Sequence, residues 1–312
     1  MLSPVTSARR RLIAAVGVVL GWLSAGLAAE SQPDDLLGRG EYLFRAAGCG
    51  NCHTDTDNGG EFLAGGYALD TPFGTFYSPN ITPHSEYGIG AWSEQDFIRA
   101  MKAGVAPDGT DYFPVFPYTS YTGLTHGDLR ALKAYLFSVP PVAAPNRRHD
   151  TLPGLRRGLW LWKLLFFTPK VAKAPPDADP AWARGAYLAT AAVHCGECHT
   201  PRNRLGAMID SLYLAGTRDG PEGKSVPNIT PDRTTGIGRW DHDDLTFYLK
   251  TGGTPDGDYA GGLMAEVIDN GLKHLTQADR AAIATFVLSL PAIERRVAES
   301  SETRKPRDEF EY

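Results

Sequence analysis

The sequence lacks the residues and motifs of several common classes of protein. It has only four cysteines and four methionines among its 312 residues. All four cysteines lie in two short segments, which leaves none for a disulfide bond elsewhere. Neither a G-x-G-x-x-G nucleotide-binding loop nor a G-x-S-x-G nucleophile elbow is present. The net charge of −5 argues against nucleic acid as a partner. The two cysteine segments are therefore the main source of chemistry.

Both cysteine segments, Cys49–His53 and Cys195–His199, follow the pattern C-x-x-C-H, which is the attachment motif of a c-type haem. Two thiols three residues apart on a helical turn can add to the two vinyl groups of one porphyrin, and the histidine that follows can bind its iron. Two structural disulfides are the rival interpretation, but they leave the repeated histidine as a coincidence. The sequence thus predicts two covalently bound haem c groups. The cofactor-binding residues would be Cys49, Cys52, Cys195 and Cys198, with His53 and His199 as iron ligands.

Other sequence words also occur twice, in the same order and at a nearly constant offset. The repeated pairs are Arg39–Leu43 with Arg184–Leu188, Asn80–Pro83 with Asn228–Pro231, Gly88–Trp92 with Gly236–Trp240, and Leu124–Asp128 with Leu275–Asp279. The repeat predicts an internal duplication, with haem domains at 35–140 and 181–293. A linker at 141–180 would join them, and a polar tail would follow at 294–312.

Each predicted domain consists of a few helices joined by long loops. Helices are predicted at 37–53 and 181–199, leading into the haem motifs, and at about 126–138 and 277–289, where apolar residues recur at helical spacing. A further amphipathic helix would begin at Ser93 in the first copy and at Asp243 in the second, since serine and aspartate are good N-caps. The long loops would pack on the haem, which is a large apolar body.

The N-terminal residues 1–29 resemble an export signal. Three arginines, Arg9 to Arg11, precede an apolar run from Leu12 to about Leu27, and Ala28 and Ala29 offer a cleavage site. The run is roughly 16 residues long, whereas a transmembrane helix needs about 20. Cleavage would give a periplasmic protein. Retention as an anchor would attach it to the periplasmic face of the inner membrane.

The linker contains an apolar, aromatic segment at 155–167 that is too short to span a bilayer. One interpretation is a linker helix packed across the seam between the domains. The other is a surface helix in contact with the membrane interface or a partner subunit, because Arg156, Arg157 and Lys163 flank its tryptophans. The sequence leaves both interpretations open.

The second axial ligands of the two irons are predicted to differ. Met264 follows a glycine pair in the predicted loop before the last helix, where its thioether would bind the second iron. The repeat aligns Phe116 with Met264, and a phenyl ring cannot bind iron. His84 or His126 would give a bis-histidine first haem, and the remaining alternative is an open or weakly bound position.

On these motifs the chain resembles the two-haem cytochrome c subunits of bacterial periplasmic and membrane-bound dehydrogenases. The resemblance covers roughly residues 37–293 and includes Phe116–Tyr118 and His199–Asn203 beside the repeated words. It implies an all-α fold of two tandem class I cytochrome c-like domains related by internal duplication. In many relatives a methionine serves the first haem where this chain has Phe116, so that ligand does not carry over, whereas Met264 stands at its expected place.

The resemblance implies electron transfer without catalysis by this chain itself. A dihaem cytochrome of this kind carries electrons from the catalytic subunit of a periplasmic dehydrogenase to the respiratory chain, where a quinone, a cytochrome or a terminal oxidase accepts them. The alternative is a haem enzyme, peroxidase-like or acting on sulfur compounds, with an open site at the first haem. A high-spin haem that binds cyanide or peroxide rapidly would distinguish this enzyme from the carrier.

Overall fold

The structure, a computed structural model, describes residues 33–169 and 177–297. We call these ranges the first half and the second half. The predicted export signal at 1–29 and residues 298–312 of the tail predicted at 294–312 lie outside the described residues, so both stay predictions. Within the two halves, every helix is too short or too polar to cross a membrane.

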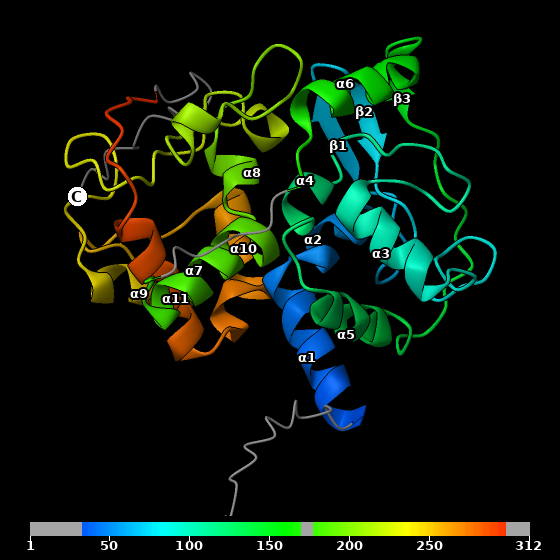
Figure 1. Cartoon of the computed structure of the whole chain (residues 1–312), viewed down its shortest axis with the longest axis horizontal. Helices are drawn as coiled ribbons and strands as arrows, with labels where there is room; N and C mark the ends of the chain where they lie inside the picture. Colours follow the sequence, from blue (N-terminus) through cyan, green and yellow to red (C-terminus); the bar gives the residue numbers. More distant parts are fainter. Residues whose placement is uncertain (1–32, 170–176, 298–312) are drawn as a thin grey trace, which may run out of the picture. The chain divides into compact units, whose positions relative to one another are not determined.

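Helices dominate both halves, and strands occur only in the first (Figure 1). The first half contains α1 (Pro33–Ala46), α2 (Cys49–His53), β1 (Ala68–Thr71), β2 (Gly74–Tyr77), α3 (Glu94–Ala103), α4 (Tyr118–Tyr121), α5 (His126–Leu136), β3 (Asp150–Thr151) and α6 (Leu159–Phe166). The second contains α7 (Pro180–Tyr187), the π-turn η3 (Leu188–Ala192), α8 (Gly196–His199), α9 (His242–Thr251), α10 (Gly262–Asn270) and α11 (Gln277–Leu288). Short 3₁₀ turns are η1 (Thr56–Asn58), η2 (Leu155–Gly158), η4 (Asp210–Leu212), η5 (Pro221–Gly223) and η6 (Leu272–His274).

Side-chain caps fix where the amphipathic helices begin. The predicted start at Ser93 is confirmed, since Ser93 and Asp96 form a reciprocal capping box at the start of α3. The predicted start at Asp243 was wrong by two residues. Asp241 is the N-cap of α9, and Asp243 lies inside its first turn, where its charge interacts favourably with the helix dipole.

Each predicted helix into a haem motif is interrupted just before the motif. In the first half, Gly48 adopts a left-handed conformation (φ 60°), which ends α1 and starts the separate turn α2. In the second half, the π-turn follows α7, and His194 has φ 46°. The prediction of continuous helices at 37–53 and 181–199 was therefore wrong. In each half, the interruption changes the direction of the chain between the first helix and the haem motif.

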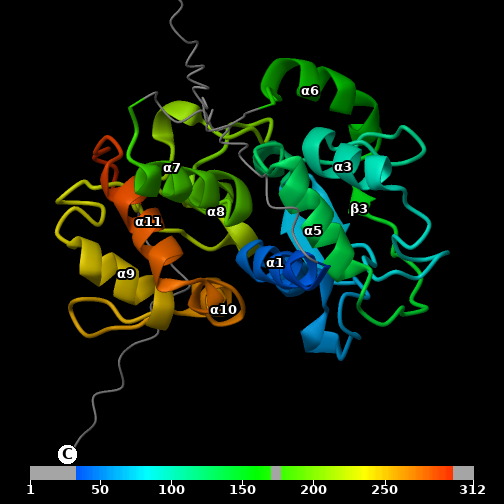
Figure 2. The same cartoon turned by 60° about the horizontal axis from the view of Figure 1, so that its bottom comes forward.

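In each half, the first helix packs through a glycine against the helix that was predicted as the last of its domain. α1 lies beside α5, and α7 lies beside α11 (Figures 1 and 2). A Cβ atom on Gly40 would lie 2.0 Å from the carbonyl oxygen of Ala131, and one on Gly185 would lie 1.8 Å from that of Ala282. The glycine in the repeated Arg-Gly word is therefore required by the helix crossing. The predicted core role of the apolar residues on these last helices is confirmed by burial: Leu129, Leu132, Leu136, Ile283, Phe286 and Val287.

The structure is mostly helical, in agreement with the predicted helical class. A small antiparallel sheet in the first half was not predicted. Its strand order is β1-β2-β3, with Thr71 paired to Gly74 at the β1–β2 turn. Helix α6 lies over these strands (Figure 1) and buries Leu159 beside Phe76 and Phe113. The strands are only two to four residues long and carry no strong alternation of apolar and polar residues, so the sequence pattern does not predict them.

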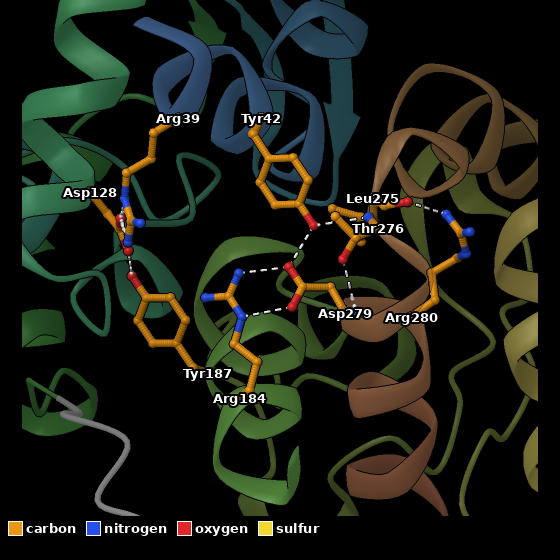
Figure 3. A network of polar contacts seen from close by, with 9 residues as sticks. All are labelled: Arg39, Tyr42, Asp128, Arg184, Tyr187, Leu275, Thr276, Asp279 and Arg280. Carbon is orange, nitrogen blue, oxygen red and sulfur yellow. Dashed lines mark hydrogen bonds and ion pairs between the residues drawn. The ribbon is translucent and has the colours of Figure 1, made fainter. Parts of the chain in front are cut away.

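Two aspartates join the halves through side chains (Figure 3). Asp279 accepts hydrogen bonds from Arg184 at 2.8 and 2.6 Å, and from Tyr42 of the other half at 2.5 Å. Asp128 has the equivalent contacts in the first half. It accepts a hydrogen bond from Arg39 of its own half at 2.5 Å and another from Tyr187 of the second half. Each half thus supplies a tyrosine to the other's carboxylate.

Candidate functional site

The two C-x-x-C-H motifs form short helical turns that carry unpaired thiols. Cys49 and Cys52 lie on α2, while Cys195 and Cys198 lie at the start and inside of α8, and none forms a disulfide. Burial raises the pKa of Cys49 and of Cys195 to about 12. Both thiols are therefore protonated and uncharged at neutral pH. In addition, no group of three metal-binding side chains occurs between residues 33 and 169 or between 177 and 297.

Both motif histidines are held in one tautomer by a proline carbonyl. His53 Nδ1 lies 2.8 Å from the carbonyl oxygen of Pro79, and His199 Nδ1 lies 2.9 Å from that of Pro227. A carbonyl oxygen only accepts, so each ring donates from Nδ1, and Nε2 keeps a free lone pair. Burial lowers the pKa of both imidazoles and outweighs the opposing effect of the carbonyl. Each is therefore a neutral, oriented imidazole, the form that binds a metal ion.

The same pattern of hydrogen bonds stabilises the loop that follows each motif histidine in the two halves. Thr54 Oγ1 accepts the N–H of Leu63 at 3.1 Å, and Thr200 Oγ1 accepts that of Leu214 at the same distance. Both leucines are fully buried with φ 61°, a conformation that costs free energy and needs such support. The next bonds run from Gly65 N to His53 O at 2.8 Å and from Gly216 N to His199 O at 2.7 Å. Sequence analysis missed these residues, although the repeated Leu-Ala-Gly word was a visible signal.

The residues beside the second C-x-x-C-H motif fit a large group that carries hydrogen-bond acceptors. The ring of Tyr213 lies against Gly196, where a Cβ atom would come within 2.6 Å of Tyr213 Cε2. The Tyr213 hydroxyl is buried and has no hydrogen-bond partner among the described residues. A buried, unpartnered hydroxyl costs free energy unless a further acceptor is supplied. A haem carries propionates that can accept such a bond, so the residues present fit this group.

Met264 lies in the first turn of α10 and not in a loop. The loop prediction was wrong, because Gly261 in an extended conformation ends the loop and Gly262 already begins the helix. The Met264 side chain is partly buried and packs against the core. At the aligned position, Phe116 contacts the rings of Tyr112 and Tyr121 at centroid distances of 5.5 and 5.8 Å.

The two histidines considered for the first iron have local roles. His84 Nδ1 accepts the backbone N–H groups of Glu86 and Tyr87 at 3.2 and 3.1 Å, and its ring stacks on that of Tyr87. His126 is exposed at the first residue of α5. The structure thus gives His84 a turn-capping role and leaves His126 at the surface.

The segments around the two motifs touch one another. His194, next to Cys195, has Nε2 3.2 Å from the carbonyl oxygen of Ala47 and 3.3 Å from the hydroxyl of Tyr121. Glu197, inside the second motif, accepts from Thr119 at 2.9 Å and Ser120 at 2.5 Å, both on α4 of the first half. In return, Asn270 of α10 donates to Asn51, inside the first motif, at 2.9 Å. The two motifs are neighbours in space.

The positive charge of Arg202 stabilises the buried Glu197 carboxylate at this contact. Burial raises the pKa of Glu197, but the nearby Arg202 guanidinium and the hydrogen bonds from α4 outweigh it, so the pKa lies below its ordinary value. Arg202 NH2 lies 2.5 Å from Glu197 Oε2. Glu197 is therefore an ionised acceptor that links α8 to α4.

Comparison with known proteins gives one family match. The cytochrome c family model matches residues 37–140, which begin within α1 and include the first motif and α2 to α5. These bounds differ by two residues from the predicted start of the first domain and agree with its predicted end.

Three relatives are similar over most of the chain. A protein named diheme cytochrome c-type from Cereibacter sphaeroides is 41% identical over 302 residues, which is 92% of this chain and 100% of the relative. The fructose dehydrogenase cytochrome subunit of Gluconobacter japonicus is 40% identical over 94% of this chain, and the gluconate 2-dehydrogenase cytochrome c subunit of Pantoea cypripedii is 40% identical over 89%. The chain spans 61% and 65% of the length of these two subunits.

Proposed function

Because the chain belongs to the dihaem c-type cytochromes, we propose that it receives electrons from the catalytic subunit of a dehydrogenase and passes them to the respiratory chain. The protein carries two covalently bound haem c groups. Several relatives are named as cytochrome subunits of dehydrogenases that act on fructose, gluconate or alcohols.

The motif residues would hold both haems and would supply one iron ligand to each. Cys49 and Cys52 would bind the first haem through thioethers, and Cys195 and Cys198 the second. His53 and His199 would bind the irons through Nε2. When bound, each haem supplies an iron that gains and loses one electron. The observation that carries this proposal is the bond from Nδ1 of each histidine to a proline carbonyl, because it leaves Nε2 unprotonated at both motifs.

We assign Met264 as the second ligand of the second iron and leave the first iron without a thioether. The partly buried position of Met264 in the first turn of α10 supports the assignment. A thioether ligand raises the reduction potential of a c-type haem. The second haem would then be the site of higher potential if histidine supplies both ligands of the first iron.

The second half would be a second cytochrome c domain related to the first by duplication. Three sets of contacts recur in both halves: the glycine crossing at Gly40 and Gly185, the histidine–proline bond, and the aspartate that joins an arginine and a tyrosine. Recurrence of unusual local geometry supports common descent of the two halves more strongly than helix content does.

The acceptor would be a quinone, another cytochrome or a terminal oxidase, and the protein would work in the periplasm or on the periplasmic face of the inner membrane. The arginines and apolar run at 1–29 support export. The touching motifs support transfer between the two haems within one chain, since each motif hydrogen-bonds to the other half.

Haem counting and rapid kinetics test this function. Mass spectrometry of the matured protein should find two attached haems, and one in each of the double variants C49A/C52A and C195A/C198A. The fully reduced protein, mixed with an oxidised soluble c-type cytochrome, should be oxidised within milliseconds to seconds. A matured wild type with fewer than two haems, or with no transfer to any cytochrome or quinone acceptor, would refute the proposal.

A second candidate function is a haem enzyme with an open position at the first iron, acting on peroxide or on a small sulfur compound. It is favoured by one observation, the aromatic side chain of Phe116 at the position aligned with Met264. A high-spin spectrum with rapid cyanide and peroxide binding at one haem would support it. Two low-spin haems that ignore both ligands would support the carrier.

A further inference from the structure

Helix α6 presents an entirely apolar face to solvent. The outward side chains are 64% exposed at Trp160, 43% at Leu161, 73% at Leu164 and 61% at Leu165. Their spacing places all four on one side of the helix. We call these four residues the α6 patch. Soluble surface helices normally direct such side chains inward, so this face signals an interaction.

The polar side of α6 faces the protein, which fixes the outward direction of the patch. Lys163 Nζ, on the inner side, donates to the carbonyl oxygens of Ala103 and Gly104 at 2.7 and 2.8 Å and pairs with Asp111 at 2.5 Å. Leu159 is buried on the same side. The helix cannot rotate its leucines inward without breaking these bonds. The inverted polarity is therefore built into the fold.

Exposed apolar residues on neighbouring loops extend the α6 patch. Trp162 Nε1 donates to the carbonyl oxygen of Leu205 at 2.8 Å, which holds that loop of the second half beside α6. Leu205 is 56% exposed, and so is Leu152, in the loop that leads into the helix. The apolar surface is thus larger than one helix face.

An arginine-lined groove extends to η2, the turn that directly precedes α6 in the chain. It has a volume of about 470 Å³, and its cationic lining residues are Arg147, Arg148 and Arg156. Arg147 lies over the ring of Tyr77 at 3.9 Å, and Arg156 lies over that of Phe113 at 4.7 Å. These contacts hold the guanidinium groups at the surface. We call this feature the arginine groove.

The local charge is opposite to that of the whole chain. Residues 141–169 contain four arginines and one lysine but a single acidic residue, Asp150, whereas the whole chain has a net charge of −5. A surface that carries positive charge beside an apolar patch is complementary to a bilayer with anionic headgroups, which has a negatively charged layer above an apolar one. The outward face of α6 offers one polar hydrogen, on the indole of Trp160. A protein partner normally needs hydrogen bonds about every 100–200 Å².

We propose that the α6 patch and the arginine groove dock the protein on a lipid bilayer that contains anionic headgroups. The leucines would enter the boundary between headgroups and acyl chains, with Trp160 at the interface and the arginines on lipid phosphates. The proposal rests on the proposed location at the membrane and adds the surface that would make the contact. None of the residues of this surface belongs to a C-x-x-C-H motif. Failure of this proposal would leave the electron-transfer function intact.

Vesicle flotation of the matured holoprotein tests the proposal. Wild type should float with vesicles of phosphatidylcholine and phosphatidylglycerol, float poorly with phosphatidylcholine alone, and be released as salt concentration rises. L164S/L165S should reduce binding at least tenfold. Its control is F247S, because Phe247 is equally apolar and 58% exposed on α9. No binding of wild type to anionic vesicles, or equal loss in F247S, overturns the proposal.

Charge reversal provides an independent test. R147E/R148E should abolish the preference for anionic vesicles, while R218E/R233E, which changes the net charge equally at exposed sites of the second half, should keep it. Haem content and thermal unfolding of each variant report folding. If wild type ignores vesicles and L164S/L165S instead loses co-purification with its dehydrogenase, the patch is a protein interface and the lipid proposal fails.

Discussion

Tyr42 and Asp279, 237 positions apart in the sequence, are joined by a hydrogen bond of 2.5 Å (Figure 3). The Tyr42 hydroxyl donates to the carboxylate and also accepts the backbone N–H of Thr276 at 3.2 Å. One side chain of the first half thus organises the N-terminus of α11 in the second. Tyr187 does the same for Asp128 and Thr125 in the opposite direction.

Removal of this hydroxyl should loosen the contact between the halves. We expect Y42F to lower the free energy of unfolding by about 1–2 kcal/mol, because a partly buried carboxylate loses a donor. Denaturant unfolding followed by circular dichroism measures the change. Y259F, at an exposed tyrosine, is the control and should have no effect. Equal stability of wild type and Y42F would show that the bond contributes nothing.

The same carboxylate should make stability depend on pH. Burial raises the pKa of Asp279, but the hydrogen bonds from Arg184 and Tyr42 outweigh it, so the pKa lies below its ordinary value of 3.8. The charged form is therefore favoured by folding, and its contribution is fully present above about pH 4 and is lost as pH falls through the lower folded pKa. D279N should be less stable than wild type at pH 7. The difference should shrink below pH 4, and a constant difference across this range would contradict the argument.

The helix crossing at Gly40 should reject any side chain. G40A would place a Cβ atom 2.0 Å from the carbonyl oxygen of Ala131, so α1 and α5 must separate. We expect a loss of roughly 2–3 kcal/mol in the free energy of unfolding. G38A is the matched control on the same helix, since nothing lies within 4 Å of its added Cβ atom. It should stabilise the protein by about 0.5–1 kcal/mol, because alanine favours the helix.

Substitution of Met264 tests the proposed ligand of the second iron. M264A should lower the reduction potential of one haem and abolish any methionine–iron absorption near the red end of the spectrum. Potentiometric titration followed by absorbance measures both. M101L, at a buried methionine of α3, should change neither. An unchanged spectrum in M264A would remove the assignment.

Restoration of a thioether at the first site tests the asymmetry between the haems. F116M should raise the potential of the first haem and suppress cyanide binding if the wild-type iron is open. F116L is the control, because it changes size without adding a ligand atom. No shift in F116M would show that the segment before α4 lies away from the iron.

Local chemistry made much of the site visible in the sequence. The C-x-x-C-H words, Ser93 as a helix cap and the apolar stripes of α5 and α11 all follow from short-range spacing, which is set by the geometry of a helical turn. The repeated Arg-Gly, Asn-Ile-Thr-Pro and Leu-Thr words predicted an internal duplication. These features depend on neighbours within a few residues of one another.

Tertiary structure decided what distant segments do to each other. The carbonyl oxygens of Pro79 and Pro227 orient the two motif histidines. Tyr42 and Tyr187 each form a hydrogen bond to an aspartate of the other half. The ion pair of Lys163 with Asp111 holds α6 so that its leucines face outward. None of these follows from spacing, because each hydrogen bond joins groups whose approach is set by packing of the whole chain. The sequence by itself determined which chemical groups the protein carries. The packing of distant segments determined how the side chains that bear these groups are oriented.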